Sequence, residues 1–386
     1  MSSDLRLRAD HLVTPTETIH DALLTISGTR LTSCTPYEPS PGSEPEHIAG
    51  WVVPGFVDTH VHGGGGHDYA TEDPQQAVDA RDYHARHGTT TSLASLVTAP
   101  IDVLCRQLET LADLVEDGHF AGIHLEGPFL SPAQPGAHDT ALLRLPDPAT
   151  VERLVAAGRG ALRIVTLAPE LPGGEAAMKQ LQAAGVRVAI GHTDADQHVA
   201  ASAIDGGARV VTHLFNAMRR IHHREPGPIP HLLTDDRVNV ELIADGFHLH
   251  PDVLRMAVAA AGPDRVMLVT DAMAASGMPD GEFRLGSHAV RVREGQARLV
   301  TDDSEAGPIA GSTLTMAGAF VEMTALTGDI PTVAALASTN AARHYGLGEV
   351  GRLEPGSRAD LCVVDDQGDL QGVMRAGQWL PSSDPR

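Results

Sequence analysis

The sequence predicts an α/β fold in which strand–helix units close into a (β/α)8 TIM-type barrel, with a small β-sandwich domain built from both chain termini. Three observations support this fold class. The chain has 386 residues, of which 42% are hydrophobic, so a sizeable core can form. Short β-branched runs alternate with helix-like stretches from Trp51 onward, as in parallel sheets. No GxGxxG turn follows the first run, which disfavours a doubly wound open sheet.

The predicted barrel covers residues 51–345. Its strand candidates are eight apolar or β-branched runs, and eight is the strand number of this barrel. They are residues 51–61, 89–97, 120–126, 162–168, 186–191, 209–213, 238–245 and 265–271. The helix candidates between them are amphipathic or rich in alanine. They include residues 74–87, 101–117, 174–184, 194–206 and 251–261.

The two ends of the chain have a different character from the middle. Residues 1–50 and 346–386 contain short strand-like pieces separated by turns with glycine and proline. Neither end is long enough for a stable β domain alone, so we expect the two together to form the small sandwich. Residues 282–300 resemble a hairpin inserted after the eighth strand.

Charge and cysteine content exclude several classes of protein. The formal net charge is −22, from 28 basic and 50 acidic residues, which argues against a nucleic-acid or anionic-membrane surface. The three cysteines lie far apart without a CxxC pair, so neither a disulfide framework nor a cysteine–zinc module is expected. No signal-peptide pattern and no apolar run of about 20 residues is present, so we expect a cytoplasmic protein without membrane contact.

Candidate functional residues lie at the ends of the predicted strands, where barrel enzymes carry their active sites. The first strand ends in Asp58-Thr59-His60-Val61-His62. Strand residues two apart share a face, so His60 and His62 can approach one ion together. Four further strand ends supply Glu126, His192, His213 and Asp271.

Four imidazoles and two carboxylates at one rim form a typical donor set for a divalent metal ion. A lone HxH pair is a weak signal, and a single histidine at a strand end is more often a structural hydrogen-bond partner. Five strand ends that carry such groups in barrel order predict a metal centre. We expect zinc, with iron, manganese or cobalt as alternatives.

Several motifs resemble the N-acetylglucosamine-6-phosphate deacetylase family of the amidohydrolase superfamily. Over residues 51–320 they are PGFVDTHVHGG, HLEGPF, GAHD, GHTDA, THLFNAM, ADGFH, TDAM and IAGSTLTM. The HxH pair and the tail GRLEPGSRADLCVVD are similar to the superfamily in general, whereas HLEGPF with GHTDA and THLFNAM is more specific. The resemblance implies a metal-dependent enzyme that converts N-acetyl-D-glucosamine 6-phosphate to D-glucosamine 6-phosphate and acetate.

The resemblance also implies how the metal is held. Glu126, His192 and His213 match the ligands of the principal ion. His60 and His62 match first-strand ligands that some members of the family lack, which suggests room for a second ion with Glu126 as a bridge. We therefore expect one or two ions per subunit.

The composition removes one alternative for a bridge between two ions. Other amidohydrolases bridge two metals through a carboxylated lysine at a strand end. The only lysine of this chain, Lys179, falls in a predicted helix. Glu126 is then the remaining candidate.

Roles in the reaction follow from the same resemblance. Asp271 is expected to act as general base and acid, because a divalent ion brings the pKa of a water molecule toward neutrality and a nearby carboxylate can accept its proton. His138 is expected to contact the substrate and polarise its carbonyl. The other positions that match substrate-contacting residues are Ala137, Asn216, Ala217, Asp245, His248, Ile309, Ala310 and Gly311.

A phosphorylated substrate needs a local basic group in this acidic chain. The segment Met218–Arg224 is its densest basic stretch, and arginine suits phosphate well. In the family, the residue that matches Arg224 reaches the phosphate of the neighbouring subunit, which implies a homodimer. Two alternatives remain: a deacetylase of another N-acyl amino sugar, such as N-acetylgalactosamine 6-phosphate, and a non-catalytic scaffold of the same fold.

Overall fold

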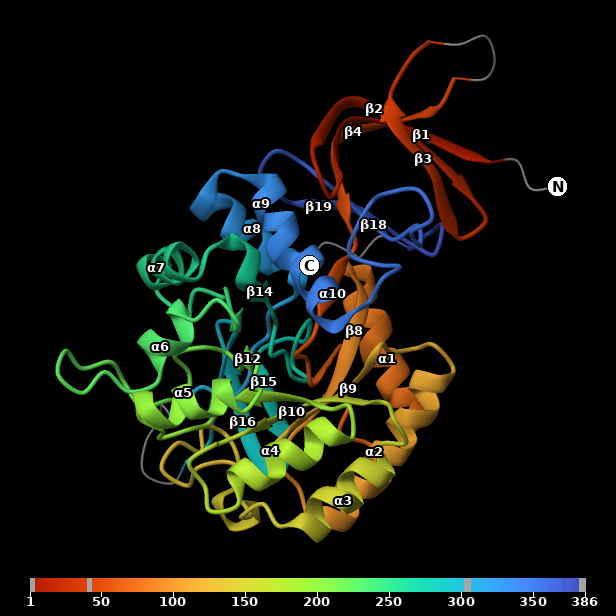
Figure 1. Ribbon diagram of the computed structural model, residues 1–386. Coiled ribbons are helices and arrows are strands. Elements are labelled where there is room, and N and C mark those ends of the chain that lie inside the picture. The colour runs from red at the N-terminus through yellow and green to blue at the C-terminus, as the bar shows by residue number, and fades with distance from the viewer. Residues whose placement is uncertain (1–3, 40–43, 302–306, 382–386) are drawn as a thin grey trace. The chain divides into compact units, whose positions relative to one another are not determined.

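The computed structural model describes residues 4–39, 44–301 and 307–381 (Figure 1). The chain divides into two compact units. The first contains residues 1–58, 82–91 and 315–386, and the second contains residues 59–81 and 92–314. All the candidate metal ligands belong to the second unit.

An eight-stranded sheet forms the barrel, and its strands follow one another in sequence order. From β8 to β14 the neighbouring strands pair in parallel. The segments that follow the first and last strands are also joined, since the Asp271 N–H donates to the His60 carbonyl at 2.8 Å and the His62 N–H donates to the Ala272 carbonyl at 2.8 Å. The predicted barrel is confirmed. Its strands are β5 (Phe56–Asp58), β8 (Thr89–Leu96), β9 (Gly122–Glu126), β10 (Leu162–Leu167), β11 (Arg187–Ile190), β12 (Val210–Val211), β13 (Asn239–Leu242) and β14 (Val266–Leu268).

Helices alternate with these strands, as the periodicity predicts. In α2 the buried residues Leu104, Leu108 and Leu111 recur at helical spacing, and Asp147 and Asp196 cap α3 and α5 through backbone N–H groups. The helices are α1 (Pro74–Arg86), α2 (Ile101–Glu116), α3 (Pro148–Ala157), α4 (Gly174–Ala183), α5 (Gln197–Asp205), α6 (Ile229–Thr234) and α7 (Pro251–Ala261). Within the residues described, no helix is long and apolar enough to cross a membrane.

The first unit contains a seven-stranded sheet made from both ends of the chain, as expected. Antiparallel pairing of β18 with β4 joins the two ends, and alternating buried residues such as Leu7, Leu24 and Leu361 pack into one apolar cluster. The sheet order is β20 (Gln378–Trp379), β19 (Leu370–Arg375), β18 (Leu361–Val364), β4 (Glu46–Pro54), β1 (Leu5–Val13), β2 (Thr18–Ser27) and β3 (Arg30–Pro36). The same unit contains α8 (Met316–Thr327), α9 (Ile330–Ala334), a π-helical stretch (Ala335–Thr339) and α10 (Asn340–Tyr345).

The first predicted strand, residues 51–61, is in fact divided between two sheets. Residues as far as Pro54 belong to β4, and only Phe56–Asp58 belong to the barrel. Gly55 stands at the division, and a Cβ there would lie 2.4 Å from the Thr90 hydroxyl. The Pro54-Gly55 pair, a local turn signal, therefore marks a change of sheet within the predicted strand.

The insertion after the last barrel strand has three strands instead of the expected hairpin. They are β15 (Gly281–Leu285), β16 (His288–Arg293) and β17 (Gln296–Leu299), paired antiparallel. Glu294 and Gly295 both have positive φ, 50° and 73°, and so form a tight turn between β16 and β17. A short pair, β6 (Gly63–Gly64) and β7 (His67–Asp68), follows the first barrel strand.

Candidate metal centre and active site

The candidate ligands stand at or just beyond the carboxyl ends of barrel strands. Glu126 is the last residue of β9, and His60 and His62 follow β5. His192, His213 and Asp271 come two or three residues after β11, β12 and β14 and have positive φ values of 49°, 30° and 49°. Left-handed backbone is uncommon for residues other than glycine and clusters at functional sites.

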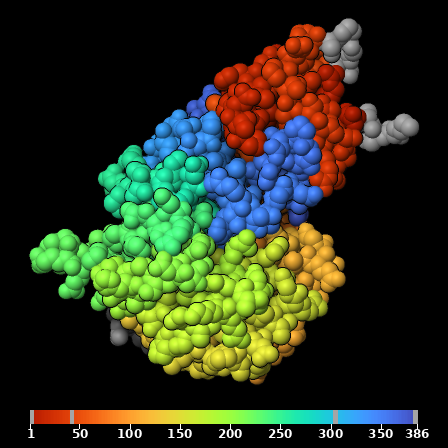
Figure 2. Space-filling model, in the orientation of Figure 1, coloured from red at the N-terminus to blue at the C-terminus, as the bar shows by residue number. Residues whose placement is uncertain are grey.

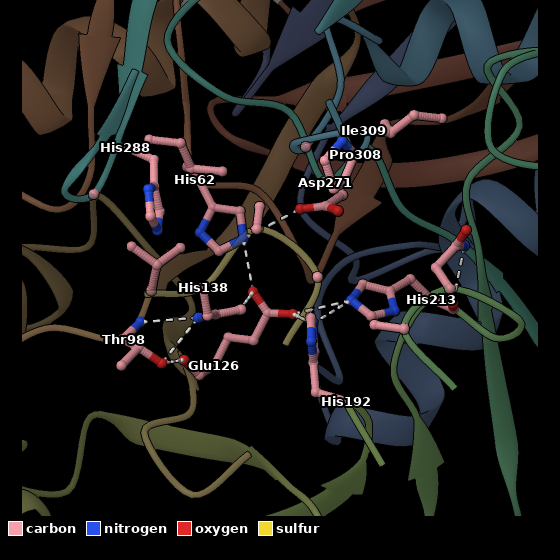
Figure 3. A pocket seen from close by; sticks show the side chains of 18 of the residues that line it. His62, Thr98, Glu126, His138, His192, His213, Asp271, His288, Pro308 and Ile309 are labelled. Atoms are coloured by element: carbon pink, nitrogen blue, oxygen red, sulfur yellow. Dashed lines mark hydrogen bonds and ion pairs between the residues drawn. The ribbon is translucent and has the colours of Figure 1, made fainter. Parts of the chain in front are cut away.

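Glu126, His192 and His213 form one compact group. Oε1 of Glu126 lies 3.0 Å from Nε2 of His192 and 3.0 Å from Nε2 of His213. The two imidazole nitrogens are 3.1 Å apart. The ligand atoms all lie within 4.8 Å of one another, and the three side chains are buried. Figure 3 shows them converging from separate strands.

A second group consists of His60, His62 and Asp271. Nε2 of His62 lies 3.1 Å from Nε2 of His60 and 3.2 Å from Oδ1 of Asp271. The other carboxylate oxygen of Glu126, Oε2, lies 3.3 Å from Nε2 of His62. Glu126 therefore spans the two groups, as expected for a bridging ligand.

The geometry of these groups fits a divalent cation. In each group, two buried imidazole nitrogens face each other at 3.1 Å, which brings lone pairs together unless a proton or a cation lies between them. His192 Nδ1 donates to the Gln134 carbonyl at 3.1 Å, so in the neutral ring Nε2 keeps its lone pair toward Glu126. Histidine and carboxylate donors of this kind suit zinc and neighbouring transition metals.

Burial and charge shift the pKa values of the site in opposite directions. Burial alone would raise the pKa of Glu126, but His60, His138 and His192 outweigh it and hold that pKa well below its ordinary value. For Asp271, the histidines at positions 60 and 62 likewise outweigh burial and lower the pKa. Both carboxyl groups are therefore ionised at neutral pH.

The imidazoles of the two groups also differ. Burial lowers the pKa of His192 to about 4, which keeps that ring neutral as a metal ligand must be. Burial would also lower the pKa of His62, but its hydrogen bonds to Asp271 and Glu126 prevail and raise it to about 9.

His138 faces the same centre from the loop after β9. Its Nε2 lies 3.4 Å from Oε2 of Glu126. The Thr98 backbone N–H donates to its Nδ1 at 3.4 Å, and the Thr98 hydroxyl lies 2.9 Å from the same nitrogen. Because Nδ1 accepts, the proton of the neutral ring is on Nε2. Nε2 thus faces Oε2 of Glu126 with its N–H (Figure 3).

These groups open into a cavity of about 270 Å³. Gly136 lines it at close range to His192, where a Cβ would come within 2.8 Å of the ring. Seven of the predicted substrate-contacting residues line the cavity: Ala137, His138, Asn216, Ala217, His248, Ile309 and Gly311.

The other three predicted substrate-contacting residues lie outside the cavity lining of the described chain. Asp245 holds His248, with Oδ2 2.6 Å from Nδ1. Ala310 is buried in an apolar cluster. Arg224 is exposed in the loop before α6 and contacts His223.

Several residues of the site were not predicted from the sequence. Val97, Thr98, Leu285 and His288 line the cavity, but none of them carries a recognisable signal in a single sequence. Glu241 in β13 is buried, and its Oε2 lies 3.2 Å from Nδ1 of His60. A carboxylate inside an apolar strand run is the one signal that could have found it.

A barrel that gathers imidazoles and carboxylates at the ends of its strands defines a class of metal-dependent hydrolases. The chain belongs to the amidohydrolase family, whose model matches residues 51–380.

Individual relatives are deacetylases of amino sugar phosphates. The chain is 36% identical to N-acetylgalactosamine-6-phosphate deacetylase of Escherichia coli O157:H7, over 96% of this chain and 98% of that protein. It is 34% identical to N-acetylglucosamine-6-phosphate deacetylase of Lysinibacillus sphaericus, over 85% of each. Among solved structures, N-acetyl-D-glucosamine-6-phosphate deacetylase of Mycobacterium smegmatis in complex with N-acetyl-D-glucosamine-6-phosphate matches with a TM-score of 0.93 at 44% identity, covering 98% of this chain and 99% of that one.

Proposed function

We propose that the chain hydrolyses the acetamide of N-acetyl-D-glucosamine 6-phosphate and releases D-glucosamine 6-phosphate and acetate. The observation that carries this proposal is a single cavity lined by Glu126, His192, His213, Asp271 and His138. It is supported by the 44% identity to a deacetylase solved with that sugar phosphate.

Glu126, His192 and His213 would hold the principal ion, and His60, His62 and Asp271 provide donors for a second one. We propose zinc, because these donors suit its tetrahedral preference. A bound divalent ion supplies a Lewis acid that polarises the amide carbonyl and acidifies a water molecule.

The side chains of the cavity would carry the protons. Asp271, ionised and within reach of His62, accepts a proton from the attacking water and delivers it to the amide nitrogen as the C–N bond breaks. His138 donates a hydrogen bond from Nε2–H to the carbonyl oxygen as negative charge develops there. Water thus supplies the added oxygen of acetate and one proton of the free amine, and its second proton is released when the acetic acid ionises.

The phosphate would be bound away from the two metal groups, and a neighbouring subunit would contribute one of its contacts. Asn216, Ala217 and His248 line the cavity, while Arg224 of the same chain stands outside it. The loop that precedes α6, green at the left of Figure 2, projects from the surface. This projection supports the proposal that Arg224 reaches the cavity of a neighbouring subunit in a homodimer.

N-acetylgalactosamine 6-phosphate is a second candidate substrate. The Escherichia coli relative named for that substrate is 36% identical over 96% of this chain. The two sugars differ in one hydroxyl configuration, and the same metal groups would serve either.

The test compares kcat/KM of the zinc-loaded protein for both epimers, each with and without the 6-phosphate. We expect the glucosamine epimer to be preferred and phosphate removal to lower kcat/KM by at least about tenfold, because charge-assisted contacts to the phosphate are lost. Preference for the galactosamine epimer would assign the second candidate. No deacetylation of any of the four compounds by the metal-loaded protein would indicate the scaffold instead. The cytoplasm remains our prediction for its location.

A further inference from the structure

One wall of the cavity is apolar and contains no candidate metal ligand. It consists of Val97, Ala137 and Leu285, and we call these three residues the acyl wall. Val97 and Leu285 are 8% and 7% exposed and share one packed cluster, against which Ala137 also packs. The wall is therefore the edge of a hydrophobic core and not a set of isolated surface groups.

The three-stranded insertion supplies Leu285 to this wall. Leu285 ends β15 and is the buried residue of that strand, while Val290 and Val292 of β16 pack behind it. The Gly286–Ser287 turn follows at once and also lines the cavity. A Cβ on Gly286 would lie 3.3 Å from Cγ2 of Val97, so the tip of the insertion is in close contact with the loop after β8.

One polar contact ties this tip to the loop after β9, and a second lies within the tip itself. The Ser287 hydroxyl donates to Oδ2 of Asp139 at 3.0 Å, and the Arg284 guanidinium donates to the Ser287 carbonyl at 2.7 Å. Asp139 follows His138 in the loop after β9. Leu285 is thus held between a packed core and a tethered turn, and it cannot withdraw to admit a larger group without disturbing both.

The acyl wall lies beside the group that would bind the carbonyl oxygen. Thr98, the residue after Val97, holds Nδ1 of His138, and Ala137 directly precedes His138. The substituent on an acyl carbon is one bond from the carbonyl carbon. If Nε2–H of His138 contacts the oxygen, that substituent must lie near the neighbours of His138.

We propose that Val97, Ala137 and Leu285 form the subsite for the acyl group and restrict the enzyme to acyl groups of acetyl size. This inference rests on the proposed deacetylase function, and it identifies the residues that determine which acyl substituent the enzyme accepts. An apolar methyl group suits this wall, because the wall offers no side-chain hydrogen-bond partner. Each further methylene has to displace Leu285 or Val97 from a packed cluster, which is unfavourable.

The experiment measures kcat/KM for the N-acetyl, N-propionyl and N-butyryl forms of glucosamine 6-phosphate. In each protein the readout is the ratio of the butyryl to the acetyl value. This ratio is independent of metal loading and of the active fraction, since both substrates meet the same preparation. We expect a low ratio in the parent and a rise of at least about tenfold in Leu285→Ala, because one methylene in an apolar pocket changes selectivity by about 10- to 200-fold.

Val290→Ala is the matched control. Val290 is fully buried in the same cluster but is not among the residues that line the cavity, so this variant should lose stability and keep the parental ratio. Leu285→Val and Val97→Ala provide smaller enlargements, and they replace Leu285→Ala if that variant does not fold. Each should raise the propionyl-to-acetyl ratio.

The possible results separate this inference from the proposed function. Folded wall variants with the parental ratio would overturn the acyl wall while leaving the deacetylase intact. Hydrolysis of none of the three compounds by the parent would overturn the proposed function together with this inference. If Val290→Ala raised the ratio as much as Leu285→Ala, the acyl wall would also be overturned. General loosening of the cluster would then explain the effect.

Discussion

Oε2 of Glu241 lies 3.2 Å from Nδ1 of His60, and both side chains are buried inside the barrel. The same oxygen is 3.4 Å from the backbone N–H of His213. A carboxylate on one nitrogen of an imidazole fixes the tautomer and directs the lone pair of the other nitrogen toward a metal. Here Nε2 of His60 faces Glu126 and Asp271.

Removal of the Glu241 carboxylate should therefore weaken metal binding by the second group. We expect Glu241→Gln and Glu241→Ala to lower the affinity for one zinc ion about 10- to 100-fold, the range found for such outer partners. Titration of the metal-free protein with zinc, followed by calorimetry, measures this. Asp360→Asn removes another buried carboxylate, outside the barrel site, and should leave zinc affinity unchanged. Equal loss in both variants would indicate a general stability effect.

Asp271 should be needed for proton transfer more than for holding the principal ion. In Asp271→Asn we expect kcat to fall by about 10²- to 10⁴-fold, as is typical when a general acid–base is removed. The ion held by Glu126, His192 and His213 should remain, as metal analysis of the purified variant can show. A metal-replete Asp271→Asn protein with parental kcat would contradict the assignment.

The stability of the first unit should depend on one aromatic contact. Phe56 and Phe320 are fully buried and stack with ring centroids 5.1 Å apart. We expect Phe320→Ala to lower the free energy of unfolding by about 3–5 kcal/mol, the range for such truncations in cores. Denaturant titration measures it, and Met256→Ala, at a residue 45% exposed, is the control. A shift below 1 kcal/mol would show that the contact is loosely packed.

The cysteines should react slowly in the folded protein. Burial raises the pKa of Cys34 to about 11, and burial likewise raises the pKa of Cys362 and of Cys105. Only the thiolate is nucleophilic, so alkylation at pH 8 should be slow and should accelerate as the pH approaches those raised values. Mass spectrometry after timed iodoacetamide treatment measures each site. Fast labelling of buried Cys362 without denaturant would contradict this expectation.

The barrel could be predicted from the sequence because its strands and helices have short-range patterns, and the two residue groups could be predicted because the strands of a barrel end at one rim. The two-residue period of a strand places His60 beside His62, and barrel closure brings the other strand ends to the same rim. Glu241 was not predicted in its role, because it lies inside the predicted strand 238–245 and not at a strand end, where functional residues are expected.

The features that could not be predicted depend on packing between distant parts of the chain. The division of residues 51–61 between two sheets depends on how closely Gly55 approaches Thr90. The part played by Leu285 depends on where the inserted strands fold back against the loop that contains Val97. The first relationship is marked only by the local turn signal Pro54-Gly55, and the second leaves no periodic signal in the chain.

The left-handed backbone at His192, His213 and Asp271 limits how far the thermal stability of this chain can be raised. Glycine would relax each of these three positions, so inert glycine variants should tolerate heat better than their alanine counterparts. Random substitutions selected for higher thermal stability would then replace these three functional residues first. Engineering for durability should leave these three turns untouched and seek its gains elsewhere in the fold.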